Sequence, residues 1–297
     1  MDRNPPGDVR RQLAREVRFG CPVSRCGSPY LTWHHFDPPW AVREHHDPAG
    51  MVALCRDHHP EADAGAFTID QLREFKRVGR DRRRLLGARF NWRREELLAI
   101  VGGSFYYRTP IGVRVNDIPV VWFNRDDSGH VLVNLQMLTT SGEPRLLMLD
   151  NFWMTEGADE HEIECPPSGR LVSAKYANGD KLKIAFRVVK SLEQLDRRFP
   201  TKTPRALQRR YEKLGWPPPT TWTTHADAVR GAGVTFPIAT VEITMEIAGT
   251  GLSFSPRRTA IGTNQLIGGW ISNCGVGVQI GDPAGRAGDK RQPPGLP

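Results

Sequence analysis

The chain has 297 residues, which is room for one large domain or two ordinary ones. Its formal net charge of +8 and its isoelectric point near 9.5 favour a polyanionic partner over a neutral one. No stretch is long and apolar enough to span a membrane, so no membrane partner is expected. No hydrophobic leader follows the N-terminus, so we expect a cytoplasmic protein.

Metal-binding residue types gather near the N-terminus, after a predicted helix or arm over residues 1–18. Three of the five cysteines and three His-His pairs lie within residues 21–59, in the order Cys21, Cys26, His34-His35, His45-His46, Cys55 and His58-His59. Such a density is unusual for an ordinary hydrophobic core. It predicts at least one metal site.

Two close pairs, Cys21 with Cys26 and Cys55 with His58, have the spacing of a tetrahedral zinc site. The alternative is a set of free buried thiols, and a disulfide is disfavoured because nothing directs the chain to an oxidising compartment. We therefore predict a structural zinc ion. The isolated Cys165 and Cys274 are expected to be small buried apolar residues.

These residues resemble the HNH endonuclease family, also called ββα-metal or His-Me finger nucleases, in the subgroup braced by a structural zinc. The similarity covers the finger predicted at residues 19–65. It implies that His34 and His59 hold one catalytic divalent cation, Mg²⁺ or similar, and that His35 is the general base. The family's central asparagine has no counterpart, and Asp47 and His46 are the nearest candidates to replace it.

The chemistry suits these side chains. Imidazole, with an ordinary pKa of about 6.5, is mostly neutral at cellular pH and can take a proton from water. A divalent cation neutralises charge on a phosphodiester and stabilises the leaving oxygen. Adjacent strand positions face opposite sides, so His34 and His35 are expected to have separate roles. His45 and His46 are expected on the connecting loop, most simply without a role, and the alternative is that they help to orient the base or touch substrate.

A basic helical segment is predicted over residues 66–101. Its start signal is Thr68 followed by Asp70 and Gln71, and residues 71–94 hold ten basic side chains against two acidic ones. One alternative is a solvated linker helix. The other is a surface that contacts phosphates flanking the cut, through Arg73, Lys76, Arg77, Arg80, Arg83 and Arg84.

Short apolar runs broken by turn signals predict a larger, antiparallel β-rich domain over residues 102–281, and thus an α+β protein overall. The clearest strands are 181–188, after an Asn178-Gly179 pair suited to a type I′ turn, and 241–247. A helical, Pro-rich connector is predicted near residues 191–219, with a helix over 204–214. Residues 282–297 are expected to be a disordered tail.

Together these features predict an endonuclease that hydrolyses DNA, with its target chosen by the β-rich domain through DNA or through a protein partner. A catalytically silent nucleic-acid-binding module is the alternative from another class. An RNase of the same fold is a third option, since the sequence does not separate DNA from RNA.

Overall fold

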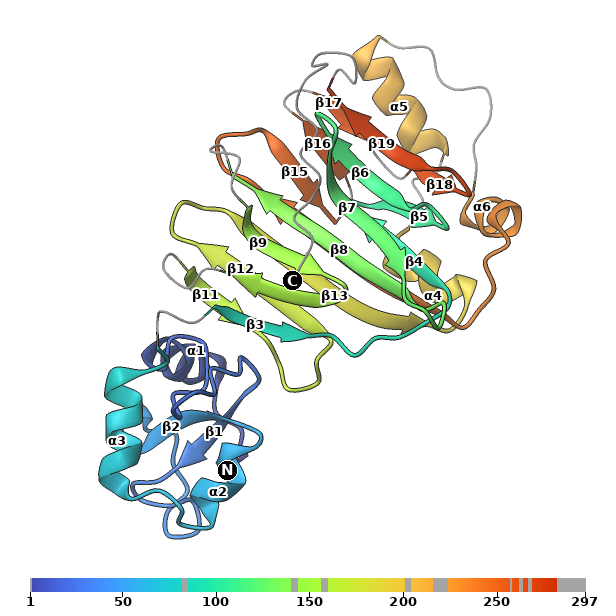
Figure 1. The fold of residues 1–297 in the computed structure, drawn as a ribbon. Coiled ribbons are helices and arrows are strands. Elements are labelled where there is room, and N and C mark those ends of the chain that lie inside the picture. Colours follow the sequence, from blue (N-terminus) through green and yellow to red (C-terminus); the bar gives the residue numbers. More distant parts are fainter. Residues whose placement is uncertain are drawn as a thin grey trace.

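The computed structural model describes residues 2–81, 85–139, 144–155, 160–200, 204–215, 224–256, 258–261, 264–266 and 269–281. Its helices are α1 (Gly7–Glu16), η1 (Pro48–Gly50), α2 (His58–Asp63), α3 (Ile69–Val78), α4 (Leu192–Arg198), α5 (Pro204–Leu214) and α6 (His225–Ala232). The chain divides into an N-terminal lobe, residues 2–81, and a β-rich body (Figure 1). The predicted α+β class is confirmed.

The N-terminal lobe is built around a hairpin of β1 (Leu31–His35) and β2 (Met51–Cys55), paired from Leu31 opposite Cys55 to His35 opposite Met51. Every residue of β2 is buried, because α1 and α3 pack against it. Helix α2 begins three residues after β2 ends. This ββα order places the metal-binding residue types of the hairpin beside those of α2.

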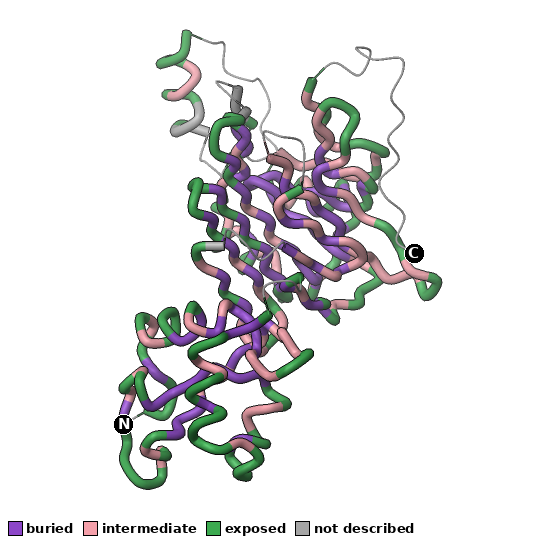
Figure 2. The backbone as a smooth tube through the Cα atoms, turned by 60° about the vertical axis from the view of Figure 1, so that its left-hand side comes forward, coloured by how far each residue is buried: buried purple, intermediate pink, exposed green. Residues whose placement is uncertain are grey.

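Two sheets form the body and share one hydrophobic core (Figures 1 and 2). The first has the strand order β19-β6-β7-β8-β9-β10-β3, and the second runs β11-β12-β13-β14-β15-β16-β17, with β4, β5 and β18 attached through β14. The strands of the first are β3 (Leu86–Arg89), β6 (Ile111–Val115), β7 (Ile118–Arg125), β8 (Val131–Leu138), β9 (Pro144–Leu149), β10 (Phe152–Thr155) and β19 (Val276–Ile280). Those of the second are β4 (Leu97–Val101), β5 (Ser104–Tyr107), β11 (Glu160–Glu164), β12 (Leu171–Tyr176), β13 (Lys181–Val189), β14 (Ile238–Glu246), β15 (Leu252–Ser255), β16 (Arg258–Ile261), β17 (Asn264–Leu266) and β18 (Trp270–Ser272).

Most strand pairs are antiparallel, as predicted, and the pairs β4–β14, β5–β18 and β6–β19 are parallel. The alternation predicted from Val241 to Ile247 is confirmed, and that in β13 holds from Leu182 to Ile184 but fails at Ala185, which is buried, and at Val188, which is exposed. The two strands pair over their full length. The turn before β13 differs from the expectation: Gly179 has a φ of 94° but Asn178 is not in the left-handed region, so the turn is not type I′.

The predicted helix over 66–101 is wrong beyond Val78. A capping box between Thr68 and Gln71 starts α3 as expected, and Gly79, with a φ of 66°, ends it. A Cβ at Gly79 would lie 2.8 Å from the Glu16 carbonyl, so this helix-ending conformation requires glycine there. The next segments are β3 and β4, and the body begins at β3 and not at residue 102.

Strand β4 shows why a helix was predicted in this region. Its run Leu-Leu-Ala-Ile-Val is buried on both faces. Leu97, Ala99 and Val101 belong to the main core, while Leu98 and Ile100 pack on α4 and α6. A strand covered on both sides shows no alternation. Its partner β14 lies far along the chain, so local pattern could not identify it.

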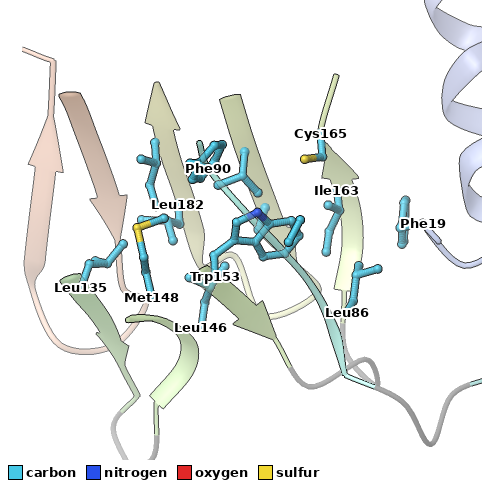
Figure 3. Close-up of a cluster of buried hydrophobic side chains, with 14 of the residues drawn as sticks. Phe19, Leu86, Phe90, Leu135, Leu146, Met148, Trp153, Ile163, Cys165 and Leu182 are labelled. Carbon is cyan, nitrogen blue, oxygen red and sulfur yellow. The ribbon is translucent and has the colours of Figure 1, made fainter. Parts of the chain in front are cut away.

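The lobe and the body are packed together. Phe19 of the lobe reaches the core around Leu86, Ile163 and the buried Cys165 (Figure 3). The Tyr30 hydroxyl donates to the Arg89 carbonyl at 3.0 Å. Cys165 is therefore a buried apolar residue, as predicted, whereas Cys274 is only half-buried.

The helix over 204–214 is confirmed as α5, and α4 precedes it in the predicted connector. The three prolines at 217–219 and the predicted tail from residue 282 lie outside the described residues.

Candidate metal centres

Four side chains of the lobe converge in one cluster, formed by Cys21, Cys26, Cys55 and His58. Nδ1 of His58 lies 3.1 Å from Sγ of Cys55 and 3.5 Å from Sγ of Cys21. The sulfurs of Cys26 and Cys55 are 3.7 Å apart, far beyond a disulfide bond, and all the cysteines are free. This Cys3His cluster can hold a metal ion.

The loop that carries the first two cysteines is shaped by backbone bonds. The amide of Cys21 donates to the Ser28 carbonyl at 2.9 Å, and the amide of Gly27 donates back to the Cys21 carbonyl at 3.1 Å. Gly27 has a φ of 69°, which a glycine adopts without strain. The loop thus turns Cys21 and Cys26 toward the end of β2.

Burial and the neighbouring thiols disfavour ionised thiols in this cluster when no cation is bound. Burial raises the pKa of the Cys21 thiol, and the neighbouring thiols of Cys26 and Cys55 raise it further. The pKa of Cys26 is raised for the same reasons, burial first. Three thiolates side by side repel one another, and a bound cation removes that repulsion.

A second cluster is formed by His34 of β1 with His59 and Asp63 of α2, whose ligand atoms all lie within 4.8 Å of one another. Nδ1 of His34 lies 3.1 Å from Oδ1 of Asp63, and Nε2 of His59 lies 3.6 Å from Oδ2. This His2Asp cluster can also hold a cation. Asp63 is half-exposed, so the cluster opens to solvent on that side.

The tautomer of His59 suits a ligand. The Thr32 hydroxyl donates its only hydrogen to the Leu54 carbonyl at 3.0 Å, so at 2.7 Å from Nδ1 of His59 its oxygen accepts. Nδ1 therefore carries the proton, and the lone pair is on Nε2, which faces Asp63. Such a support fixes both the tautomer and the ring orientation of a metal-ligating histidine.

The imidazoles of this cluster are held neutral. Burial lowers the pKa of His34, and the charge of His59 lowers it further, while Asp63 opposes both effects. Burial likewise lowers the pKa of His59. A neutral imidazole offers the lone pair that a metal requires.

His35 lies on the opposite side of β1 from His34, as the strand alternation predicts. It is 3% exposed, and neither ring nitrogen has a hydrogen-bond partner. Its ring centroid is 4.7 Å from that of Trp40 and 5.2 Å from that of His45. Burial, followed by the charge of His45, lowers its pKa to about 4, so the ring is neutral at ordinary pH and its burial opposes protonation.

His45 fixes the loop that follows His35. Its Nδ1 accepts from the Asp47 amide at 3.2 Å, which leaves the hydrogen on Nε2, and Nε2 donates to the Pro38 carbonyl at 2.9 Å. Asp47 instead caps η1 through the Ala49 amide. His46 stacks on Trp40 at 5.6 Å. Of the three side chains, His45 is the one whose hydrogen bond to the Pro38 carbonyl crosses this loop, and which residue replaces the family's asparagine stays a prediction.

The basic side chains of the predicted phosphate surface divide into two groups. Arg80 is only 2% exposed, and its Nε donates to the Arg18 carbonyl, so the prediction that it contacts phosphate is wrong. Lys76 is bonded to Glu16 and to the carbonyls of Pro48 and Met51.

The other members of that surface are accessible or undescribed. Arg73 and Arg77 are exposed and pair with the carboxylates of Asp37, Asp70 and Glu74. Arg83 and Arg84 lie outside the described residues. Only Arg73 and Arg77 thus remain as described members of the phosphate surface.

Sequence reasoning missed Asp63, and it gave His45 an orienting role only as the lesser alternative. Asp63 stands four residues after His59, which is the spacing that brings two side chains to one face of a helix. That signal was present in the sequence. The hydrogen bond of His45 spans a loop whose path depends on the Pro38 turn, so no local spacing indicates it.

Comparison of the chain with protein-family models, with curated proteins and with solved structures finds no match. Within the described ranges, no helix has the length and apolar character needed to cross a membrane.

Proposed function

We propose that the N-terminal lobe is a metal-dependent endonuclease finger of the HNH type, which hydrolyses phosphodiester bonds in DNA. The observation that carries the proposal is the His2Asp cluster at the junction of a ββα unit, with the free imidazole of His35 on the next residue of the strand. The Cys3His cluster braces the same unit from the other end of the hairpin.

The ion of the Cys3His cluster is proposed to be zinc. Three sulfurs and one nitrogen are a common zinc ligand set, and a tetrahedron with Zn–S bonds of about 2.3 Å places its sulfurs roughly 3.7 Å apart. The separation of Cys26 and Cys55 is 3.7 Å. Because all four positions are filled by protein, this zinc is structural.

In the His2Asp cluster, a divalent cation such as Mg²⁺ would neutralise charge on the phosphate and stabilise the leaving oxygen. His34, His59 and Asp63 would hold it, and Thr32 would keep His59 in the tautomer that binds. His35 accepts the proton of the attacking water as the water oxygen bonds to phosphorus. The bond from phosphorus to the leaving sugar oxygen breaks, and that oxygen takes a proton from solvent.

His45 holds the loop after the base, which is the task that the resemblance gives to the family's central asparagine. With His35 only 3% exposed, the proposal requires that the loop carrying Trp40 move when substrate binds. The β-rich body is proposed to select the target, through DNA or through a protein partner.

A second candidate is a catalytically silent nucleic-acid-binding module. The burial of His35 favours it, since a base that water cannot reach does no chemistry. Incubation of the purified chain with supercoiled plasmid and with a labelled RNA, in Mg²⁺, Mn²⁺ or Ni²⁺, separates these possibilities. Nicking of plasmid that EDTA abolishes supports the DNA endonuclease. Cutting of RNA alone supports an RNase, and binding without cutting at any cation supports the silent module.

A further inference from the structure

The N-terminal arm, residues 2–6, lies against the His2Asp cluster and the His46 loop. Its Asp2 carbonyl accepts from Nε2 of His46 at 2.9 Å, and Pro5 is buried. Pro6 then caps the start of α1, which is anchored in the core through Leu13. The arm is therefore held at both ends, and Arg3 lies between them.

Arg3 points to the edge of the His2Asp cluster. One of its terminal nitrogens lies 3.8 Å from Oδ1 of Asp63, and its side chain is 57% exposed. Within the described part of the chain, Asp63 is its only charged or hydrogen-bonding partner. An exposed pair at that distance contributes little stability, so bracing Asp63 does not explain why the guanidinium is there.

The guanidinium lies within reach of both halves of the proposed active site. It lies 3.8 Å from Asp63 of the His2Asp cluster, and the neighbouring Asp2 carbonyl is bonded to His46, whose ring centroid is 6.1 Å from that of His35. A phosphodiester that contacts the cation and is attacked by water from His35 must lie between these groups. Arg3 is carried to that position by the arm.

We propose that Arg3 binds the scissile phosphodiester through its non-bridging oxygens, so that the phosphate subsite is formed by the N-terminal arm together with His34, His59 and Asp63. A planar guanidinium donates two parallel hydrogen bonds to a phosphate, which a lysine ammonium does not reproduce. The inference rests on the proposed function, because it places the substrate of the same site.

The proposal fixes the sign of two effects. A positive side chain beside a cation site repels the cation, so loss of Arg3 leaves cation affinity unchanged or raises it. The same loss weakens the binding of a phosphodiester. A residue that merely supports Asp63 would do the reverse, since its removal would loosen the ligand and lower cation affinity.

The test is made in the His35→Ala background, where the duplex stays intact. Binding of Mn²⁺ is measured by calorimetry, and binding of a fluorescent DNA duplex is measured by anisotropy with and without Mn²⁺. Arg3→Ala is compared with Arg3→Lys and with Arg10→Ala, which removes an equal charge from an exposed position of α1.

We expect Arg3→Ala to weaken Mn²⁺-dependent duplex binding roughly 10–100-fold, the range of a lost charge-assisted hydrogen-bond pair, without lowering Mn²⁺ affinity. Arg3→Lys should recover part of the loss, and Arg10→Ala should change binding by about twofold or less. Equal losses in Arg3→Ala and Arg10→Ala, or a lower Mn²⁺ affinity in Arg3→Ala, would overturn the inference.

The failure of the inference is distinguishable from the failure of the proposed function. If the wild type nicks plasmid and the single variant Arg3→Ala nicks it at the same rate, the inference alone is overturned. If the chain shows neither cleavage nor any Mn²⁺-dependent duplex binding, the proposed function is overturned together with it.

Discussion

The two clusters of the N-terminal lobe are neighbours in sequence and opposites in chemistry. His58 belongs to the first and His59 to the second, although they are consecutive residues of α2. The Cys3His cluster is closed by three sulfurs and one nitrogen. The His2Asp cluster has three hard or borderline ligands and a half-exposed carboxylate, which leaves room for water or substrate. One cluster suits a structural ion and the other suits a reactive one.

The largest expected effect separates the clusters by stability. Cys55→Ser should remove the ion of the Cys3His cluster and unfold the lobe, because binding of a structural zinc is worth about 10–16 kcal/mol in small zinc modules. Metal content by mass spectrometry and thermal unfolding by calorimetry measure it. Cys274→Ser makes the same atomic change at a half-buried cysteine outside the lobe and should alter neither. A folded lobe without bound metal in Cys55→Ser would contradict the structural role.

The second effect concerns activity alone. His35→Ala should lower the rate of plasmid nicking by roughly 10²–10⁴-fold, the usual contribution of a general base, with zinc content and folding unchanged. His161→Ala, at an exposed histidine of β11, is the matched control and should nick like the wild type. Full nicking activity of His35→Ala would contradict the assignment of His35 as the general base.

A third change tests the residue that sequence reasoning missed. Asp63→Asn should lower the affinity of the His2Asp cluster for Mn²⁺ by more than the roughly 10–100-fold lost when a group that only hydrogen-bonds to a ligand is removed. Glu61→Gln removes an equal charge from an exposed position of the same helix and should leave the affinity within about twofold. Calorimetry with the zinc-loaded protein measures both, and equal losses would mean that Asp63 is not a ligand.

The smallest effect tests the division of the basic side chains. Lys76→Met should destabilise the lobe by about 1–3 kcal/mol, because it leaves Glu16 and two backbone carbonyls without their donor. Arg77→Met should leave the stability unchanged, since its exposed pair with Glu74 is screened by solvent. Urea unfolding followed by the lobe's tryptophan fluorescence compares them. A larger loss of stability in Arg77→Met than in Lys76→Met would contradict the division of these side chains into a structural lysine and a surface arginine.

Local patterns predicted much of the lobe. The cysteine and histidine spacing predicted the four residues of the Cys3His cluster, and the resemblance to the HNH family implied two of the three residues of the His2Asp cluster. The capping signal at Thr68 identified the start of α3. These features depend on short-range geometry, which sequence spacing reports directly.

The failures share a different cause. Arg80 counts as a surface charge in any local pattern, yet it is buried, with its Nε bonded to the carbonyl of Arg18 in the turn after α1. β4 resembled part of a helical stretch because its partners β14 and α6 lie more than a hundred residues later. Contacts between distant segments decide such cases, and a single sequence does not encode them in a readable spacing.

The most direct test of the two-cluster account is one chelation experiment. The wild type is dialysed against EDTA under mild conditions, its metal content is measured, and plasmid nicking is followed before and after Mg²⁺ is added back. The account predicts one zinc per chain that survives dialysis, no nicking in that state, and full nicking once Mg²⁺ returns. Nicking by the dialysed protein with zinc alone, or nicking that returns only when zinc is resupplied, would contradict it.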